Sequence, residues 1–279
     1  MSPEILFEDH HYIAVHKPGG ILTQAPKGVP SMEYWVKNYI KSKYQKPAGV
    51  YLGIPHRLDK PVSGVLLFAR NTKAAQKIAL QFQLHQVQKT YWAICEDDSQ
   101  KQLTPSGTFV DWIKKNPGQF KPELVGATIP GARQAITNYQ LIHREDAKIL
   151  IELQPKTGRT HQLRLALSHR SLPISGDSDY GSSVNIILPD PTPHFFDLSC
   201  GSNSCGARET NSSETNEKTY EQKYNCSRAC IALHAKSLEF EHPFRKTPVL
   251  LEAPLPDYWT PLLESMNYTG QQRMIIADD

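Results

Sequence analysis

The sequence has no apolar run long enough to cross a membrane, and its net charge is only +3 over 279 residues. Its first residues lack the basic segment and following apolar segment of a secretory signal peptide. No internal repeat is visible. We therefore expect a soluble, cytoplasmic protein with no membrane partner. A separate RNA-binding module before the first strand, which begins by about Ile5, is not expected either.

Cysteine is scarce, with five residues in the chain. Cys95 lies in an apolar stretch and is predicted to be a buried thiol. The other four, Cys200, Cys205, Cys226 and Cys230, lie in or beside a segment of unusual composition. Disulfides are rare in the cytosol, so these thiols either stay unligated or bind a metal. A zinc site of four thiolates is the less favoured alternative, because neither gap has the two-residue spacing of common zinc ribbons.

Positive charge is unevenly distributed along the chain. Residues 1–180 hold 23 Lys and Arg against 15 Asp and Glu, a net +8, whereas residues 181–279 hold 8 against 13, a net −5. Contacts with phosphates need local positive charge, so an RNA-facing surface in the first part is consistent with this distribution. The alternative is that the excess is scattered over solvated faces, and charge alone does not separate the two.

Composition also changes within the second part of the chain. Hydrophobic residues make up 39% of the sequence, enough for a globular core. Residues 189–193 are rich in proline, and residues 201–223 are rich in Gly, Ser, Asn, Thr and Glu. Such sequence buries too little apolar surface to offset its ordering entropy. We predict one catalytic domain over residues 1–279, with a low-complexity, cysteine-containing insertion at 184–227.

The apolar pattern predicts a chain rich in strands. Helices are expected at 31–43, with Ser31 as N-cap, at 72–84, with Asn71 or Thr72 as N-cap, and after Thr160. The second helix is expected to bury Ala75, Ile78, Ala79 and Phe82. Strands are expected within 5–16 and at 65–69, 89–95, 133–143, 147–154 and 231–240; residues 98–131 and the proline-rich end after 243 are expected to be loop and extended chain.

A short polar loop, Pro55 to Lys60, leads into the strand expected at 65–69. Its single carboxylate, Asp59, lies between Arg57 and Lys60, and nearby positive charge favours the ionised form. Asp59 is therefore suited to be a nucleophile or a base and not an acid. The alternative from spacing alone is a structural salt bridge at the start of a strand.

Six motifs in the chain occur in a characteristic order. They are His16-Lys17-Pro18-Gly19-Gly20, His56-Arg57-Leu58-Asp59 with Ser63-Gly64, Lys89-Thr90-Tyr91, Thr157-Gly158-Arg159-Thr160-His161-Gln162-Leu163-Arg164, Gly176-Asp177 with Tyr180-Gly181, and Leu233-His234-Ala235. Together they resemble the RluA-type family of RNA pseudouridine synthases. The resemblance covers nearly the whole chain outside residues 184–227.

The resemblance implies an α+β fold, the pseudouridine synthase catalytic fold, with a mixed, mainly antiparallel sheet flanked by helices and loops. It implies that the protein isomerises a specific uridine in structured RNA, either rRNA or tRNA, to pseudouridine. The reaction proceeds by base flipping and an Asp-dependent rearrangement of the glycosidic bond. It involves no redox change and no group transfer, so no cofactor is expected. The expected partner is RNA, and a monomer is the default expectation.

The resemblance also assigns roles to particular residues. Asp59 would act on the ribose at C1′, and Arg164 would pair with it and hold it ionised. Tyr91 would stack on the uracil, although periodicity alone would make it a core residue. Leu163 would pack under the base. Arg57 would fill the space that the flipped nucleotide leaves, and a plain phosphate contact is the alternative.

Three further residues of the motifs are expected to contact the substrate: His56, Arg159 and His161. The resemblance gives neither histidine a catalytic task, so each is also open to a structural role.

Two other functions are consistent with parts of the sequence. A non-catalytic RNA-binding protein on the same scaffold would be free to lose Asp59, Tyr91 or Arg164, and all three are present. A zinc-dependent nucleic-acid deaminase would use the late cysteines, but the sequence lacks its paired His-x-Glu and Pro-Cys-x-x-Cys motifs.

Overall fold

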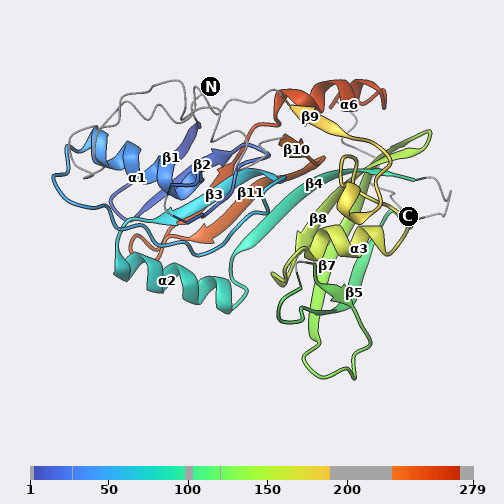
Figure 1. The fold of residues 1–279 in the computed structure, drawn as a ribbon, viewed down its shortest axis with the longest axis horizontal. Helices are drawn as coiled ribbons and strands as arrows, with labels where there is room; N and C mark the ends of the chain where they lie inside the picture. The colour runs from blue at the N-terminus through green and yellow to red at the C-terminus, as the bar shows by residue number, and fades with distance from the viewer. Residues whose placement is uncertain (1–2, 27, 98–102, 120, 189–227, 271–279) are drawn as a thin grey trace, which may run out of the picture.

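The computed structural model describes residues 3–26, 28–97, 103–119, 121–188 and 228–270. Within these residues, ten strands form one sheet in which every pair is antiparallel except β3 with β11 (Figure 1). The strands are β1 (Ile5–Glu8), β2 (Tyr12–Lys17), β3 (Ser63–Ala69), β4 (Gln88–Glu96), β5 (Ser106–Lys114), β6 (Glu123–Leu124), β7 (Arg133–Glu145), β8 (Lys148–Pro155), β11 (Leu233–Glu241) and β12 (Pro248–Glu252). The predicted α+β fold with a mixed, mainly antiparallel sheet is confirmed.

The strand order β1-β2-β3-β11-β4-β8-β7-β5-β6 places a late strand at the centre of the sheet, with β12 paired to β11. β11 lies between β3 and β4, with Ala235 opposite Gly64 on one side and Tyr91 on the other. Gly64 has a φ of +122°, and an added Cβ there would lie 2.2 Å from the carbonyl oxygen of Ala235. Glycine is therefore required where the two backbones approach. This insertion of β11 sets the distance between the Asp59 loop and Tyr91.

The two long helices cover opposite faces of the sheet. α1 (Met32–Lys43) packs on the face that carries Leu66 and Phe68, and α2 (Thr72–Gln83) packs on the face that carries Val65 and Leu67. β3 is buried along its whole length because its residues alternate between these two core layers. This explains why the apolar run at 65–69 shows no alternation.

The predicted N-caps of both helices are present. The side chain of Ser31 accepts a hydrogen bond from the N–H of Tyr34, and that of Asn71 accepts one from the N–H of Ala74. One prediction for α2 is wrong, because Ala79 is exposed. Ile78 is buried as predicted, together with Ala74 four residues before it on the same face, and Ala75 and Phe82 are partly buried against this core.

Two local predictions, for residues 98–131 and for Thr160, are corrected by the fold. Residues 98–131 contain β5 and β6, and β5 pairs along its length with β7 because Phe109 and Ile113 alternate into the core. Thr160 does not cap a helix: α3 (Gln162–Ser168) follows His161, which has a left-handed φ of 51° and no capping side-chain bond.

The chain after residue 243 is not simply extended. It forms β12, the 3-10 helix η2 (Asp257–Trp259) and α6 (Thr260–Glu264). A proline in the first turn of α6 fits the helix start, where no N–H donor is needed.

The predicted insertion lies mostly outside the described residues, as do Cys200, Cys205 and Cys226. Its first residues are described: β9 (Ile186–Leu188) pairs with β10 (Arg228–Cys230) in a small second sheet. Cys230 is buried there, and Cys95 is fully buried in β4 as predicted. A further short helix among the described residues is η1 (Ser178–Tyr180). None of the helices among the described residues is both long and apolar enough to span a membrane.

Candidate active site

A cleft of about 620 Å³ separates the loop before β3 from the segment that leads into α3. All eight residues singled out from the sequence line it, although they come from three distant parts of the chain. They are His56, Arg57, Asp59, Tyr91, Arg159, His161, Leu163 and Arg164. The fold thus brings the predicted residues together around one space.

The backbone around Asp59 is held by bonds to the N-terminal segment. Thr23 and Leu58 exchange hydrogen bonds of 2.9 and 3.1 Å, side chain to backbone. The ammonium of Lys17 donates to the carbonyl of Lys60 at 3.1 Å. Lys17 is fully buried, and this burial lowers its pKa to about 7. The position of Asp59 is therefore fixed through its neighbours in the chain.

Among the described residues, the carboxylate of Asp59 has one long ionic contact, with Arg164, and lies near the imidazole of His161. Its Oδ2 lies 3.7 Å from Nη1 of Arg164 and 3.9 Å from Nε2 of His161. Both distances exceed those of charge-assisted hydrogen bonds. The side chain is 33% exposed, so its oxygens face the cleft and remain available to a substrate.

Arg164 makes its short bonds to a residue that the sequence did not single out as a site residue. Nε and Nη2 donate to Oδ2 and Oδ1 of Asp177, each at 2.7 Å. The guanidinium also lies 4.6 Å from the ring centroid of Tyr180, and its Nη2 is 3.4 Å from Asp179. Burial alone would lower the pKa of Arg164, but the bonds to Asp177 outweigh burial and raise it. The motif Gly176-Asp177 was the one signal that pointed to this partner.

His161 connects Asp59 to the same network. Its Nδ1 shares a 2.7 Å hydrogen bond with the hydroxyl of Tyr180. Burial lowers the pKa of His161, although the negative charge of Asp59 acts in the opposite direction. A neutral imidazole therefore faces Asp59 near pH 7.

The start of α3 is tied to the sheet by a buried side chain. The amide of Gln162 accepts from the hydroxyl of Thr157 at 2.8 Å and from the N–H of Arg159 at 3.0 Å. It also donates to Thr137 in β7 at 2.9 Å. These bonds fix the turn before the helix, the task that the sequence assigned to Thr160.

Tyr91 projects from β4 into the cleft and is partly buried. Burial, together with the negative charge of Asp59, raises its pKa above the usual value. The hydroxyl therefore stays protonated at neutral pH. Leu163 and Leu233 line the same space, so an aromatic ring and two aliphatic side chains form an apolar surface beside the carboxylate.

His56 has a structural contact that its motif did not reveal. Its Nε2 accepts a hydrogen bond from the backbone N–H of Leu67 at 3.0 Å, and its ring stacks on Phe82 with centroids 5.1 Å apart. Burial, with a smaller effect of the Lys89 charge, lowers the pKa of His56 to about 3. The imidazole is neutral and its acceptor nitrogen is occupied, so it is unsuited to act as a base.

Lys89 is a cleft residue to which the sequence assigned no role. Its ammonium lies 3.5 Å from the carbonyl oxygen of Thr157. Burial, with the nearby charge of Lys156, lowers its pKa to about 8. At neutral pH it therefore still carries positive charge in the cleft.

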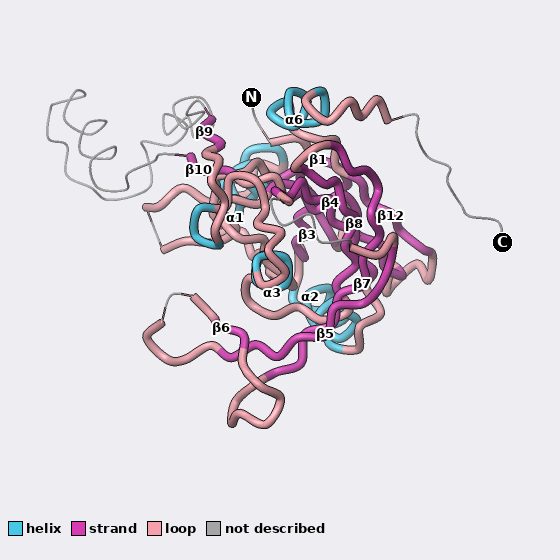
Figure 2. The backbone as a smooth tube through the Cα atoms, turned by 90° about the vertical axis from the view of Figure 1, so that its right-hand side faces the viewer, coloured by secondary structure: helices cyan, strands magenta, loops and turns pink. Residues whose placement is uncertain are grey.

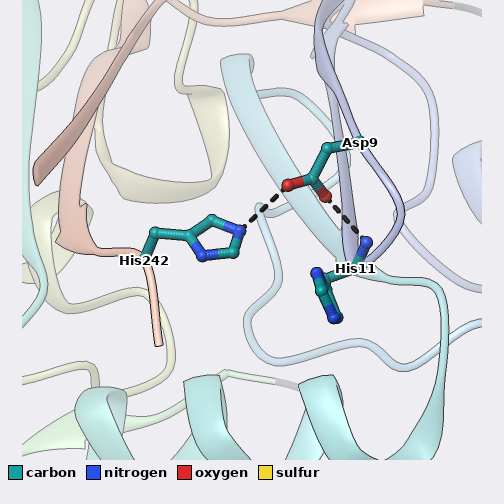
Figure 3. Close-up of side chains that lie close together, drawn as sticks. All are labelled: Asp9, His11 and His242. Carbon is teal, nitrogen blue, oxygen red and sulfur yellow. Dashed lines mark hydrogen bonds and ion pairs between the residues drawn. The ribbon is translucent and has the colours of Figure 1, made fainter. Parts of the chain in front are cut away.

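A second cluster, Asp9, His11 and His242, has the residue types of a metal site (Figure 3). The acceptors of Asp9 and His242, however, are already occupied, and the ring of His11 stacks on Phe244 with centroids 3.8 Å apart. Oδ1 of Asp9 accepts two backbone N–H groups of the turn, and Oδ2 lies 2.9 Å from both His242 Nε2 and Arg245. Nδ1 of His242 accepts two further backbone N–H groups, which places the proton on Nε2. The cluster is therefore a structural cap of the β1–β2 turn.

The fold and the cleft have the features expected of an enzyme: a partly exposed carboxylate lies beside an apolar surface, in a cleft lined by lysine and arginine. The model of the family described as RNA pseudouridylate synthase matches residues 11–169. The chain belongs to this family.

Relatives and solved structures agree with this assignment. The chain is 25% identical to tRNA pseudouridine synthase C of Vibrio cholerae over 98% of each protein. It is 30% identical to ribosomal large subunit pseudouridine synthase D of Xylella fastidiosa, over 94% of this chain and 69% of that protein. The structure of human RNA Pseudouridylate Synthase Domain Containing 4 shares the fold, with a TM-score of 0.67, 24% identity and coverage of 95% and 93%. The prediction of a pseudouridine synthase is confirmed, and the non-catalytic alternative is not favoured.

Proposed function

We propose that this protein isomerises a uridine in structured RNA to pseudouridine, with Asp59 acting on the ribose. The observation that carries this assignment is the geometry of Asp59. Its backbone is fixed, yet its carboxylate is 33% exposed in the cleft and has no ionic contact shorter than 3.7 Å among the described residues. A substrate carbon can approach such an oxygen without first displacing a tight partner.

The reaction breaks the N1–C1′ bond, turns the uracil, and joins C5 to C1′. N1 gains a proton and C5 loses one, so atoms and electrons balance without a cofactor. An ionised Asp59 either bonds C1′ or takes a proton from the sugar to give a glycal, and both routes begin from the carboxylate. Arg164, whose orientation is fixed by Asp177, supplies positive charge near Asp59 throughout.

The uracil stays bound while it turns. Tyr91 and Leu163 provide an apolar surface for its ring faces. The protonated hydroxyl of Tyr91 is available to donate to a uracil oxygen, since the raised pKa excludes the phenolate near neutrality. Lys89 adds a cation on the same side of the cleft.

A paired or stacked uridine cannot reach Asp59, so the nucleotide is flipped into the cleft. Arg57 is exposed beside Asp59 and is suited to enter the space that the base leaves. Arg159 and His161 lie on the opposite wall and are suited to contact the substrate. A phosphate contact by Arg57 is the competing role. It would weaken binding when removed, whereas loss of a wedge would slow the reaction of bound RNA.

The substrate is a structured RNA. The two bacterial relatives are named for tRNA and for the large ribosomal subunit, and either class of RNA fits a cleft of this size. Three further points stay predictions. The protein acts as a monomer, it acts in the cytoplasm, and it forms a single catalytic domain over residues 1–279 with an insertion at 184–227.

The test is a map of pseudouridine across cellular RNA from cells with and without the gene, followed by reaction of the purified protein with the identified RNA. We expect one or a few sites to disappear from the map and to be restored in vitro. An unchanged map, together with no isomerisation of tRNA or rRNA transcripts by the purified protein, would overturn the proposal.

A further inference from the structure

A second groove, of about 910 Å³, adjoins the cleft. It lies along the segments that flank β6, which project from the sheet below α3 in Figure 2. Gly158, Arg159 and Thr160 line both the groove and the cleft, so the two spaces meet at the turn before α3. The proposed chemistry uses none of the other residues that line this groove.

The groove is positively charged. Lys115, Arg133 and Arg159 line it, and none of its described lining residues is acidic. Lys115 and Arg133 have no carboxylate partner within 4.0 Å among the residues that the structure describes, whereas Arg170 nearby is paired with Asp111 at 3.0 Å. Arg159 is anchored at the junction by a 2.9 Å bond from Nε to the carbonyl of Gln134. Unpaired cations around a concave surface fit a polyanion.

At the turn where the groove meets the cleft, Gly158 leaves the backbone uncovered. The protein's own fold does not require a glycine at this position. Gly158 has no φ in the left-handed region, and an added Cβ would meet nothing within 4 Å. Neither its backbone conformation nor packing within the protein explains glycine here. A bare backbone does leave room for another chain to pass closely.

We propose that this groove binds the RNA strand that flanks the target nucleotide. Lys115 and Arg133 contact its phosphates, and the strand passes over Gly158 from the groove into the cleft. The inference rests on the proposed function and extends it, because it names the face of the protein from which the substrate enters.

The test compares two double variants of equal charge. Lys115→Gln/Arg133→Gln removes the groove cations. Lys41→Gln/Lys46→Gln removes two exposed lysines at and after the end of α1, near the opposite edge of the sheet (Figure 1). The probe is a labelled 15-nucleotide oligouridylate, titrated at several salt concentrations. Pseudouridine formation on the RNA identified by mapping is measured under single-turnover conditions at saturating enzyme, and thermal melts check folding.

We expect the groove variant to bind about tenfold more weakly at 0.1 M salt. The slope of its salt dependence should fall by roughly 1.4, about 0.7 for each single-strand phosphate that the variant no longer neutralises. The single-turnover rate of RNA bound to the groove variant should equal that of the wild type. The control variant should equal the wild type in affinity, in salt dependence and in rate. Equal affinities and slopes for the two variants would overturn the groove proposal while leaving the proposed function intact. A wild type that isomerises no RNA would instead overturn the function.

Gly158→Ala provides an independent check. We expect its melting temperature to equal that of the wild type, because the added methyl group meets nothing in the protein. Its affinity for the same oligouridylate should fall severalfold, since the methyl group narrows the passage. Unchanged affinity would contradict the route over Gly158.

Discussion

On one wall of the cleft, Asp59 is 33% exposed, and the nearest cationic atom, Nη1 of Arg164, lies 3.7 Å from its carboxylate. On the facing wall, Arg164 is 4% exposed and makes two bonds of 2.7 Å to Asp177, which is 1% exposed. Asp59 is held through its backbone, while Arg164 is held through its side chain. The rigid element of the pair is therefore the arginine and not the residue assigned to the chemistry.

This difference has a physical reason. A guanidinium bonded to Asp59 through two nitrogens would occupy the oxygens that the substrate needs. Asp177 takes the Nε and Nη2 positions, so only Nη1 is directed toward Asp59. Positive charge is then fixed near Asp59 without covering its carboxylate.

The largest effect should follow from a change on the exposed wall. Asp59→Asn keeps the size of the side chain and removes its charge and its nucleophilic oxygen. We expect no measurable pseudouridine, a loss of at least about 10³-fold, with RNA binding and melting temperature retained. Tritium release from the mapped RNA is the assay. Asp146→Asn, at an exposed turn of positive φ where asparagine is tolerated, is the matched control. Turnover by a folded Asp59→Asn protein would remove Asp59 from the mechanism.

Changes to Arg164 should cost nearly as much, and charge alone should not restore the rate. Arg164→Lys retains the positive charge but cannot bond both oxygens of Asp177 and still face Asp59. We expect Arg164→Lys and Arg164→Met both to lose about 10²- to 10³-fold in single-turnover rate, with RNA affinity little changed. If Arg164→Lys kept most of the rate, positive charge alone would be sufficient. The fixed orientation of the Arg164 guanidinium by Asp177 would then not matter for the reaction.

Asp177→Asn should combine a smaller loss of rate with a loss of stability. The variant leaves a buried guanidinium without its partner charge, so unfolding free energy should fall by about 3 kcal/mol. The rate should fall about tenfold as Arg164 loses its orientation. Urea denaturation of Asp177→Asn, Arg164→Met and the double variant gives the interaction free energy between the two side chains. We expect the double variant to be more stable than Asp177→Asn alone, and purely additive losses would contradict the pairing.

The smallest effect on the reaction is expected at His234, in the strand beside Ser63, where the change concerns stability. His234 is fully buried between Ser63, 2.9 Å from its Nδ1, and the Ala253 carbonyl, and burial lowers its pKa to about 3. Between pH 6.5 and 3 the unfolded chain binds a proton that the folded protein excludes, so stability falls as pH falls. His234 should contribute up to about 1.4 kcal/mol per pH unit.

His234→Asn tests this directly. Urea denaturation from pH 7 to pH 4.5 should show a shallower acid loss of stability in the variant than in the wild type. Carboxylates common to both proteins cancel in the comparison. Parallel curves would show that His234 does not exclude the proton.

Several elements followed from sequence because local signals agreed with tertiary packing. Ser31 and Asn71 cap α1 and α2 as predicted, and the apolar run after Gly64 became a fully buried strand. β5 was missed because the prolines and glycines around it outweighed the alternation of Phe109 and Ile113. α6 was missed because prolines were taken as helix breakers, although one of them starts the helix.

The sequence by itself determined which family the chain belongs to and predicted which residues carry the chemistry, because those residues lie in short contiguous motifs. Only the tertiary structure decided which partner each charged or polar group takes. Arg164 bonds Asp177 and only approaches Asp59, and His56 gives its acceptor nitrogen to the backbone of β3. Ionic and hydrogen-bond energies depend on distance and burial. In this protein both are set by the packing of α3 against the segment at Asp177 and of the Asp59 loop against β3.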